Sequence, residues 1–112
     1  MNVSKDSPDL LPGTLDLLIL VAMAQGSRHG YAIAEHLRST SADVLQVGES
    51  SLYPALQRLL LKGWVKAEWK LSKNNQRAKY YRLTARGKKQ LVAAQSRWDR
   101  IVAAIARVMR PA

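Results

Sequence analysis

The sequence predicts a mainly α-helical fold with one small β-hairpin. Three observations support this prediction: an amphipathic segment that ends at Gly63, a strictly alternating segment directly after it, and a longer amphipathic segment near the C-terminus. Helix, hairpin and helix in this order are typical of a winged helix-turn-helix domain followed by a C-terminal helix. A chain of 112 residues suffices for a single domain with a modest core.

The first segment predicts a helix over residues 50–62. Its apolar residues recur at spacings of three and four and form one stripe: Leu52, Ala55, Leu56, Leu59 and Leu60. Pro54 has no N–H and is tolerated in the first turn, so we expect the helix to begin near Ser50 or Ser51, both good N-caps. Gly63 offers the left-handed conformation that ends a helix. Taken alone, this pattern favours an ordinary core helix.

The hairpin changes that interpretation. Residues 65–71 alternate as a half-buried strand requires, with one apolar face: Val65, Ala67, Trp69 and Leu71. Polar residues 72–78 separate this strand from a second one over residues 79–83, where two tyrosines favour a strand. We therefore expect a basic wing over residues 72–79, and Thr84 as the cap of the last helix.

Positive charge is concentrated in the same region. Glu68 is the only acidic residue between Arg58 and Lys89, whereas lysine and arginine recur throughout this stretch. The net charge of the whole chain is +10 and its pI is about 10.4, which suits a polyanionic partner. An anionic membrane would attract this charge too, but the basic residues do not line one face of an amphipathic helix with large apolar residues opposite.

Several motifs resemble the PadR family of bacterial transcriptional regulators. They are Gly-Glu-Ser-Ser-Leu-Tyr-Pro-Ala-Leu-Gln-Arg-Leu at 48–59, Gly-Trp-Val at 63–65, Arg-Ala-Lys-Tyr-Tyr-Arg-Leu-Thr-Ala-Arg-Gly at 77–87, Gly-Thr-Leu at 13–15 and His-Gly-Tyr-Ala-Ile at 29–33. The resemblance extends from Leu11 to Met109 and is nearest to the short, acidobacterial-type group. It implies a homodimeric winged-helix protein that binds double-stranded DNA, usually a repressor and commonly autoregulatory. Ser50 stands where family members often have glycine, so the operator sequence does not carry over.

The resemblance and the charge pattern together predict a DNA interface. Gln57 and Arg58 are the residues best suited to contact base edges in the major groove, because amide and guanidinium groups form bidentate hydrogen bonds there. Ser50, Ser51 and Tyr53 are expected mainly to position the helix. The expected wing contacts to phosphates or the minor groove are Lys73, Asn74, Asn75, Arg77 and Lys79. His29 and Tyr31 match the family's His-Gly-Tyr pattern and are expected to brace the DNA backbone, although a plain helix-capping or solvated histidine is an equal alternative for His29.

The rest of the domain is expected to support this interface. Residues 15–24 are apolar almost all round, which predicts a short, central helix that is too short to span a membrane. A second helix is expected over residues 31–38, with Ile33, Ala34 and Leu37 facing the core, and residues 44–47 are short enough for a third, edge strand. The predicted organisation is a mobile N-terminal arm over 1–9, a DNA-binding domain over 10–86 and a C-terminal dimerisation helix over 87–112.

The apolar pattern of the last predicted helix indicates the oligomeric state. Its apolar stripe repeats at alternating spacings of three and four: Leu91, Gln95, Trp98, Val102, Ile105 and Met109. A homodimer would cover this stripe, whereas the alternative is a helix that folds back on the first helix of its own chain. Trp98 from both subunits could line a cleft for a flat aromatic effector, although a packing anchor at the dimer interface is the favoured interpretation.

Other classes of protein find little support. The chain has no cysteine, which excludes thiol catalysis, disulfides and cysteine metal sites and suits a cytoplasmic protein. His29 and His36 are seven residues apart, too far to share one metal ion on a helix, and Leu52 replaces the second glycine that a nucleophile elbow needs after Gly48. We expect no signal peptide, because no basic n-region precedes the first apolar segment and no processing site follows it. We therefore expect no enzyme activity, no cofactor and no metal; a protein-docking winged helix without specific DNA binding and an RNA binder are the alternatives.

Overall fold

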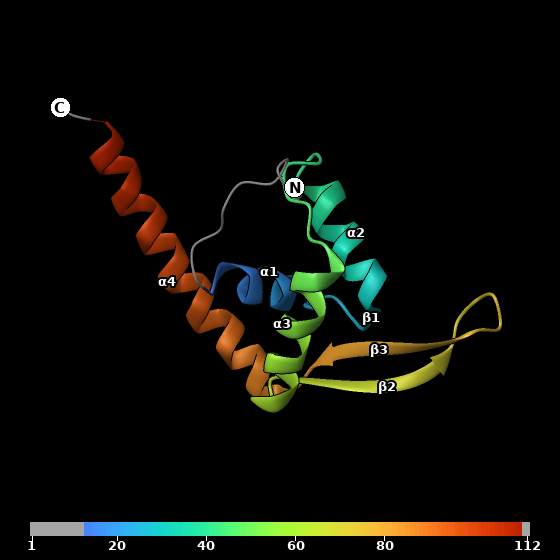
Figure 1. Cartoon of the computed structure of the whole chain (residues 1–112). Helices are drawn as coiled ribbons and strands as arrows, with labels where there is room; N and C mark the ends of the chain where they lie inside the picture. Colours follow the sequence, from blue (N-terminus) through green and yellow to red (C-terminus); the bar gives the residue numbers. More distant parts are fainter. Residues whose placement is uncertain (1–12, 111–112) are drawn as a thin grey trace.

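The computed structural model describes residues 13–110, which form four helices and a three-stranded antiparallel sheet (Figure 1). In chain order the elements are α1 (Thr14–Ala22), β1 (Arg28–His29), α2 (Gly30–Thr40), α3 (Glu49–Leu61), β2 (Val65–Leu71), β3 (Arg77–Leu83) and α4 (Ala85–Met109). The predicted fold class is confirmed. The predicted N-terminal arm lies outside the described residues.

The core lies where α1, α2 and α3 meet above the base of the sheet (Figure 1). Its largest fully buried side chains are Ile19, Leu20, Met23, Ile33, Leu52, Leu56 and Leu59. The prediction of a central first helix is confirmed, because α1 contacts all three other helices. It ends at Ala22, two residues before the predicted end, since residues 23–25 form a turn. Ile33 and Leu37 of α2 are buried as predicted, and Ala34 packs against the same core.

The helix α3 differs from its prediction at the N-terminus. It begins at Glu49, with Gly48 as an N-cap that offers no side-chain hydrogen bond, so the prediction of Ser50 or Ser51 as the cap is wrong. Pro54 therefore lies in the second turn and leaves the Ser50 carbonyl without its usual N–H partner. The helix tolerates this loss because Ser50 is exposed and water can reach the carbonyl.

The C-terminus of α3 confirms the predicted glycine stop. Gly63 has a φ of 75°, in the left-handed region. Its N–H donates to the Leu60 carbonyl at 3.0 Å, and the Trp64 N–H donates to the Leu59 carbonyl at 3.1 Å, which is the pair of bonds in a Schellman motif. These bonds turn the chain directly from α3 into β2.

The strands pair in the order β1-β3-β2. The prediction of a third strand at residues 44–47 is wrong, because the third strand is β1, which pairs Arg28 with Tyr81 and His29 with Tyr80. Residues 44–47 follow two positive-φ residues, Ala42 and Asp43, and form local hydrogen bonds instead. The N–H groups of Val44 and Leu45 both donate to Ser41, so they do not join a sheet.

The hairpin extends farther than predicted. The predicted bounds of β2 are confirmed, but β3 begins at Arg77, so Arg77 and Lys79 lie on a strand and the loop comprises residues 72–76. Val65 is buried and Ala67 is half-buried, whereas Trp69 is 58% and Leu71 65% exposed. The prediction of a half-buried strand therefore holds only near the base of the wing, because the outer half of the wing projects beyond the core (Figure 1).

Thr84 joins the base of the wing to α4. Its hydroxyl donates to the Gly63 carbonyl at 2.7 Å and accepts the Gly87 N–H at 3.0 Å, so the predicted cap is confirmed. Gly87 is buried so closely that an added Cβ would lie 1.9 Å from the Trp64 carbonyl oxygen. The first half of α4 packs along α1 and the second half projects away (Figure 1). No helix in residues 13–110 has the length and apolarity to cross a membrane.

Candidate nucleic-acid interface

The outward face of α3 carries polar side chains. Leu52, Ala55, Leu56 and Leu59 occupy its buried stripe. The exposed residues include four predicted site residues: Ser50, Ser51, Tyr53 and Gln57. Leu61 adds an exposed apolar side chain at the last turn. A face of this kind, on a helix anchored by its opposite stripe, has the shape and chemistry to enter a DNA major groove.

Arg58, which is also exposed, differs from its neighbours because its guanidinium is paired with a carboxylate of the same chain. Its Nη2 donates to Oδ1 of Asp16 on α1 at 2.8 Å, and its Nε lies 3.5 Å from Oδ2 of the same carboxylate. The hydrogen bond and the charge of Asp16 raise the pKa of Arg58 above its ordinary value. This pair joins residues 42 positions apart, so no local sequence pattern indicated it.

Tyr53 lies against the start of α2. A Cβ at Gly30 would be 2.6 Å from the Tyr53 hydroxyl oxygen, so only glycine allows the ring to lie where it does. Larger residues at position 30 would displace the end of the Tyr53 side chain. Gly30, the glycine of the His-Gly-Tyr motif, therefore has a structural function that the sequence alone did not indicate.

His29 caps α2, in agreement with the alternative interpretation of that residue. Its Nδ1 accepts the Ala32 N–H at 3.1 Å. The imidazole ring stacks on Tyr31, with ring centroids 6.4 Å apart, and meets the edge of Tyr80 at 5.5 Å. Tyr31 itself is exposed beside the wing. His29 therefore positions Tyr31 and the base of the sheet, whether or not it also contacts a ligand.

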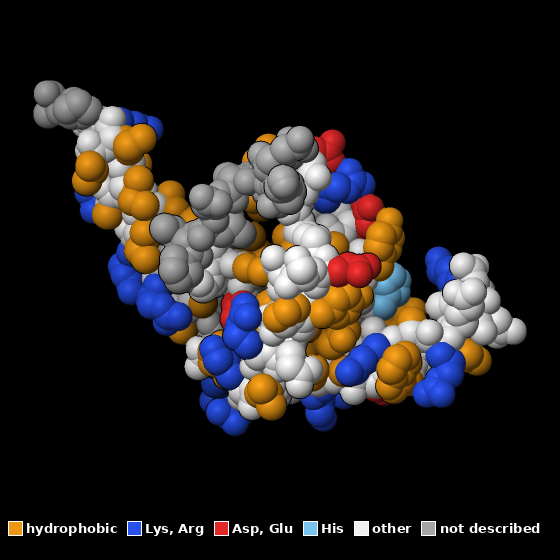
Figure 2. All heavy atoms as spheres, in the orientation of Figure 1, with side chains coloured by type: hydrophobic (Ala, Val, Ile, Leu, Met, Phe, Trp, Pro, Cys, Tyr) orange, Lys and Arg blue, Asp and Glu red, His pale blue; other side chains and the backbone are white. Residues whose placement is uncertain are grey.

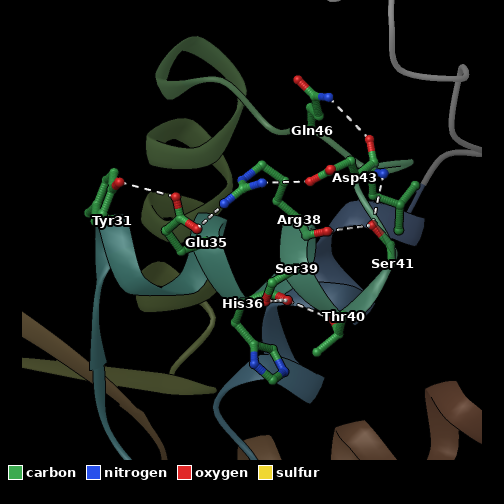
Figure 3. Close-up of polar contacts among 10 residues, drawn as sticks. Tyr31, Glu35, His36, Arg38, Ser39, Thr40, Ser41, Asp43 and Gln46 are labelled. Carbon is green, nitrogen blue, oxygen red and sulfur yellow. Dashed lines mark hydrogen bonds and ion pairs between the residues drawn. The ribbon is translucent and has the colours of Figure 1, made fainter.

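A chain of polar contacts braces Tyr31 along α2 (Figure 3). The Tyr31 hydroxyl donates to Glu35 Oε2 at 3.1 Å, and Arg38 donates to Glu35 Oε1 at 2.6 Å and to Asp43 at 2.5 Å. The hydrogen bond from Arg38, followed by that from Tyr31, lowers the pKa of Glu35, whereas the hydrogen bond to Glu35 raises the pKa of Tyr31. The spacings of four and three residues between Tyr31, Glu35 and Arg38 are the sequence signal for these contacts, because residues so spaced are neighbours on a helix.

An open hollow of about 540 Å³ lies between the wing and the helices. His29, Tyr31 and Tyr53 line one side, and Trp69, Arg77 and Lys79 of the wing line the other. The Arg77 guanidinium lies 5.3 Å from the centre of the Trp69 ring. Trp69 is therefore a candidate contact to a nucleic acid. The alternating pattern predicted it on the buried face of the strand instead. The hollow unites an aromatic lining with two basic side chains, a combination that suits the sugar-phosphate backbone.

The loop of the wing carries the remaining predicted residues. Lys73, Asn74 and Asn75 are all exposed, and Asn75 takes the left-handed conformation at the turn. Figure 2 shows lysine and arginine side chains along the wing and the lower edge of the molecule, while acidic side chains gather near α2. The hollow adjoins both the basic wing, through Arg77 and Lys79, and the exposed face of α3, through Tyr53.

The predicted dimerisation stripe on α4 divides into two parts. Leu91 packs against the core, and Trp98 is half-buried at a small cavity of about 150 Å³ that α1 also lines. Farther along, Val102 is 43% and Ile105 47% exposed, and Met109 is exposed as well. Figure 2 shows hydrophobic side chains along the projecting half of α4. The fold-back alternative thus describes only Leu91 and Trp98, because Gln95 between them is exposed.

Three packed helices with a hairpin tied to the end of α3 define a winged-helix protein, and the basic wing points to a nucleic-acid-binding one. The protein-family model described as "Transcriptional regulator PadR-like family" matches residues 19–93 of the sequence. The chain belongs to this family of transcriptional regulators, which confirms the resemblance found in the motifs.

Two solved structures agree with this assignment. A PadR family transcription regulator from Clostridium difficile superposes with a TM-score of 0.77 and 28% identity, covering 88% of this chain and 100% of that one. A transcriptional regulator from Clostridium thermocellum has a TM-score of 0.79 and 26% identity, covering 88% and 95%. An uncharacterised protein of Lysinibacillus sphaericus is 30% identical over 93 residues, which are 83% of this chain and 85% of that protein.

Proposed function

We propose that the chain is a dimeric, sequence-specific DNA-binding repressor. The observation that carries this proposal is one aromatic-lined hollow that has Tyr53 of the exposed α3 face on one side and the basic wing on the other. Duplex DNA matches all three features, because α3 fits the major groove while the wing holds the adjacent backbone. Repression is tested by a reporter under the upstream promoter of the gene, where loss of the protein is expected to raise transcription.

Each predicted site residue has a proposed function. Gln57 and Arg58 contact base edges, while Ser50, Ser51 and Tyr53 position α3 in the groove. On the wing, phosphate or minor-groove contacts come from Lys73, Asn74, Asn75, Arg77 and Lys79. Tyr31 braces the backbone on the far side of the hollow, held there by His29 and Glu35.

The wing contacts predict a change in salt dependence. Replacing both Arg77 and Lys79 with alanine is expected to weaken binding to all duplexes and to lower the slope of log K against log salt by about one unit per lost phosphate contact. Fluorescence anisotropy at several salt concentrations measures this slope. The matched control is Arg100→Ala with Arg107→Ala, which removes the same charge from α4. An unchanged slope in the wing variant would remove these residues from the interface.

Gln57 predicts a loss of discrimination rather than of general affinity. Gln57→Ala is expected to reduce the preference for operator over unrelated DNA by about 1–3 kcal/mol, because its side-chain amide would no longer contact an adenine in bidentate fashion. Parallel titrations with both duplexes measure the preference. Equal losses on the two duplexes would show that Gln57 only positions the helix.

The α4 stripe is proposed as the dimer interface. Its projecting half presents Val102, Ile105 and Met109 to solvent in one chain, and a second copy related by a two-fold axis would bury them. Such a dimer would hold two α3 helices about 34 Å apart, one turn of DNA. Because this dimer would be two-fold symmetric, we expect its operator to be palindromic.

Trp98 has two proposed functions, of which packing at the dimer interface is favoured. The other is a cleft in which Trp98 of both subunits stacks on a flat aromatic effector. The half-buried ring beside α1 would report such a ligand. In a Trp64→Phe, Trp69→Phe background, Trp98 is the only tryptophan. If its fluorescence does not change when a panel of planar compounds is added, the cleft hypothesis is wrong.

A further inference from the structure

The ion pair between Asp16 and Arg58 has a distinctive position. Among the ion pairs of residues 13–110, it alone joins two helices, α1 and α3. The Asp16 side chain is 17% exposed, whereas that of Arg58 is 52% exposed. One partner is thus largely covered by protein, and the other lies at the edge of the α3 face proposed to enter DNA.

Asp16 is the fixed partner of this pair. It lies in the first turn of α1, where free backbone N–H groups and the helix dipole favour a negative charge. Its neighbours Leu17, Ile19 and Leu20 anchor α1 in the core. Arg58 by contrast projects from α3 on a long, flexible side chain. The carboxylate therefore sets the position of the guanidinium, and not the reverse.

The contact leaves one edge of the guanidinium available. Nε and one N–H of Nη2 are directed to the carboxylate, while Nη1 has no hydrogen bond within the described part of the chain. Since the guanidinium has five N–H donors in a planar fork, Nη1 and the second N–H of Nη2 remain as an outer pair. Two parallel donors are what a bidentate contact to O6 and N7 of guanine requires.

We propose that Asp16 is a positioning residue for sequence discrimination, which holds Arg58 so that its outer edge meets a guanine in the major groove. This inference rests on the proposed function and names one base that the operator contains. A side chain already held in place loses less freedom when it binds a matched base. An unheld arginine can turn to any nearby phosphate, which carries no sequence information. The Asp16 carboxylate also repels phosphates at this flank of α3.

The experiment compares two DNA probes: duplexes that the wild-type chain selects from a random library, and the unselected library itself. The variants are Asp16→Asn, Arg58→Gln and the double substitution. We expect Asp16→Asn to lower the ratio of selected to unselected affinity at least about fivefold, the lower end of what a bidentate base contact contributes. In the Arg58→Gln background the same change is expected to have no further effect on the ratio.

Asp99→Asn is the matched control, because Asp99 is exposed on α4 and the variant loses the same charge. Equal shifts in Asp16→Asn and Asp99→Asn would show an effect of net charge alone and overturn the inference. A reduced ratio that persists in the Arg58→Gln background would overturn it as well, because Asp16 would then act through the fold. A wild-type chain that enriches no sequence would overturn the proposed function itself, before any variant is compared.

Discussion

The Gly87→Ala variant is expected to lose at least about 3 kcal/mol of unfolding free energy, the upper end of what overpacking costs. Gly87 lies in a helix, where alanine is favoured over glycine by about 1 kcal/mol, so helix propensity alone predicts the opposite sign. The added Cβ, however, would lie 1.9 Å from the carbonyl oxygen of Trp64. Backbone cannot rotate away as a side chain can, so α4 would have to separate from the base of the wing.

Urea denaturation monitored by circular dichroism measures this loss. The matched control is Gly48→Ala, because no atom lies within 4 Å of a Cβ added there. Gly48 is the N-cap of α3, and alanine there is expected to cost about 1 kcal/mol or less. If Gly87→Ala were as stable as the wild type, the contact between α4 and Trp64 would not hold the wing to the helix.

The second large effect is expected from charge on the projecting half of α4. Replacing Val102 and Ile105 with aspartate would bury charges in the proposed dimer interface, which is costly without partners. Sedimentation equilibrium should then give the monomer mass of 12.5 kDa, where the wild type gives twice that value. Affinity for a palindromic operator should fall by about a hundredfold or more, because the two α3 helices would no longer bind as a linked pair.

The control for this variant is Ser96→Asp with Ala103→Asp, which adds the same charge to the opposite face of α4. It should remain dimeric and show only the smaller loss of DNA affinity that added negative charge causes. A wild-type protein that sediments as a monomer at all concentrations would contradict the proposed interface, and the exposed apolar stripe would then need another partner.

Local signals predicted much of the fold. The stop at Gly63, the strand at 65–71 and the cap at Thr84 each depend on hydrogen bonds or alternation within a few residues, and the structure has all three. The apolar stripe of the helix also predicted which side of α3 is buried and which is exposed. These features follow from the sequence because their partners are close along the chain.

Features that depend on distant partners were missed. The two-residue strand β1 exists only because β3 lies beside it, so no alternation could indicate it. Trp69 alternates correctly with its neighbours, yet it is exposed because the core ends below it. Asp16 and Gly87 acquire their functions from Arg58 on α3 and from Trp64 in the turn before β2, which are distant along the chain. Contacts of this kind require the packed structure.

The measurement that tests the central claim most directly is a fluorescence-anisotropy titration of the protein onto the duplex upstream of its own gene. A scrambled duplex of equal length is the control, and both are measured at two salt concentrations. We predict tight binding that prefers the promoter and weakens steeply with salt, because base contacts from α3 and phosphate contacts from the wing act together. Weak binding that is equal on both duplexes would contradict an autoregulating repressor and favour a basic surface that docks a protein.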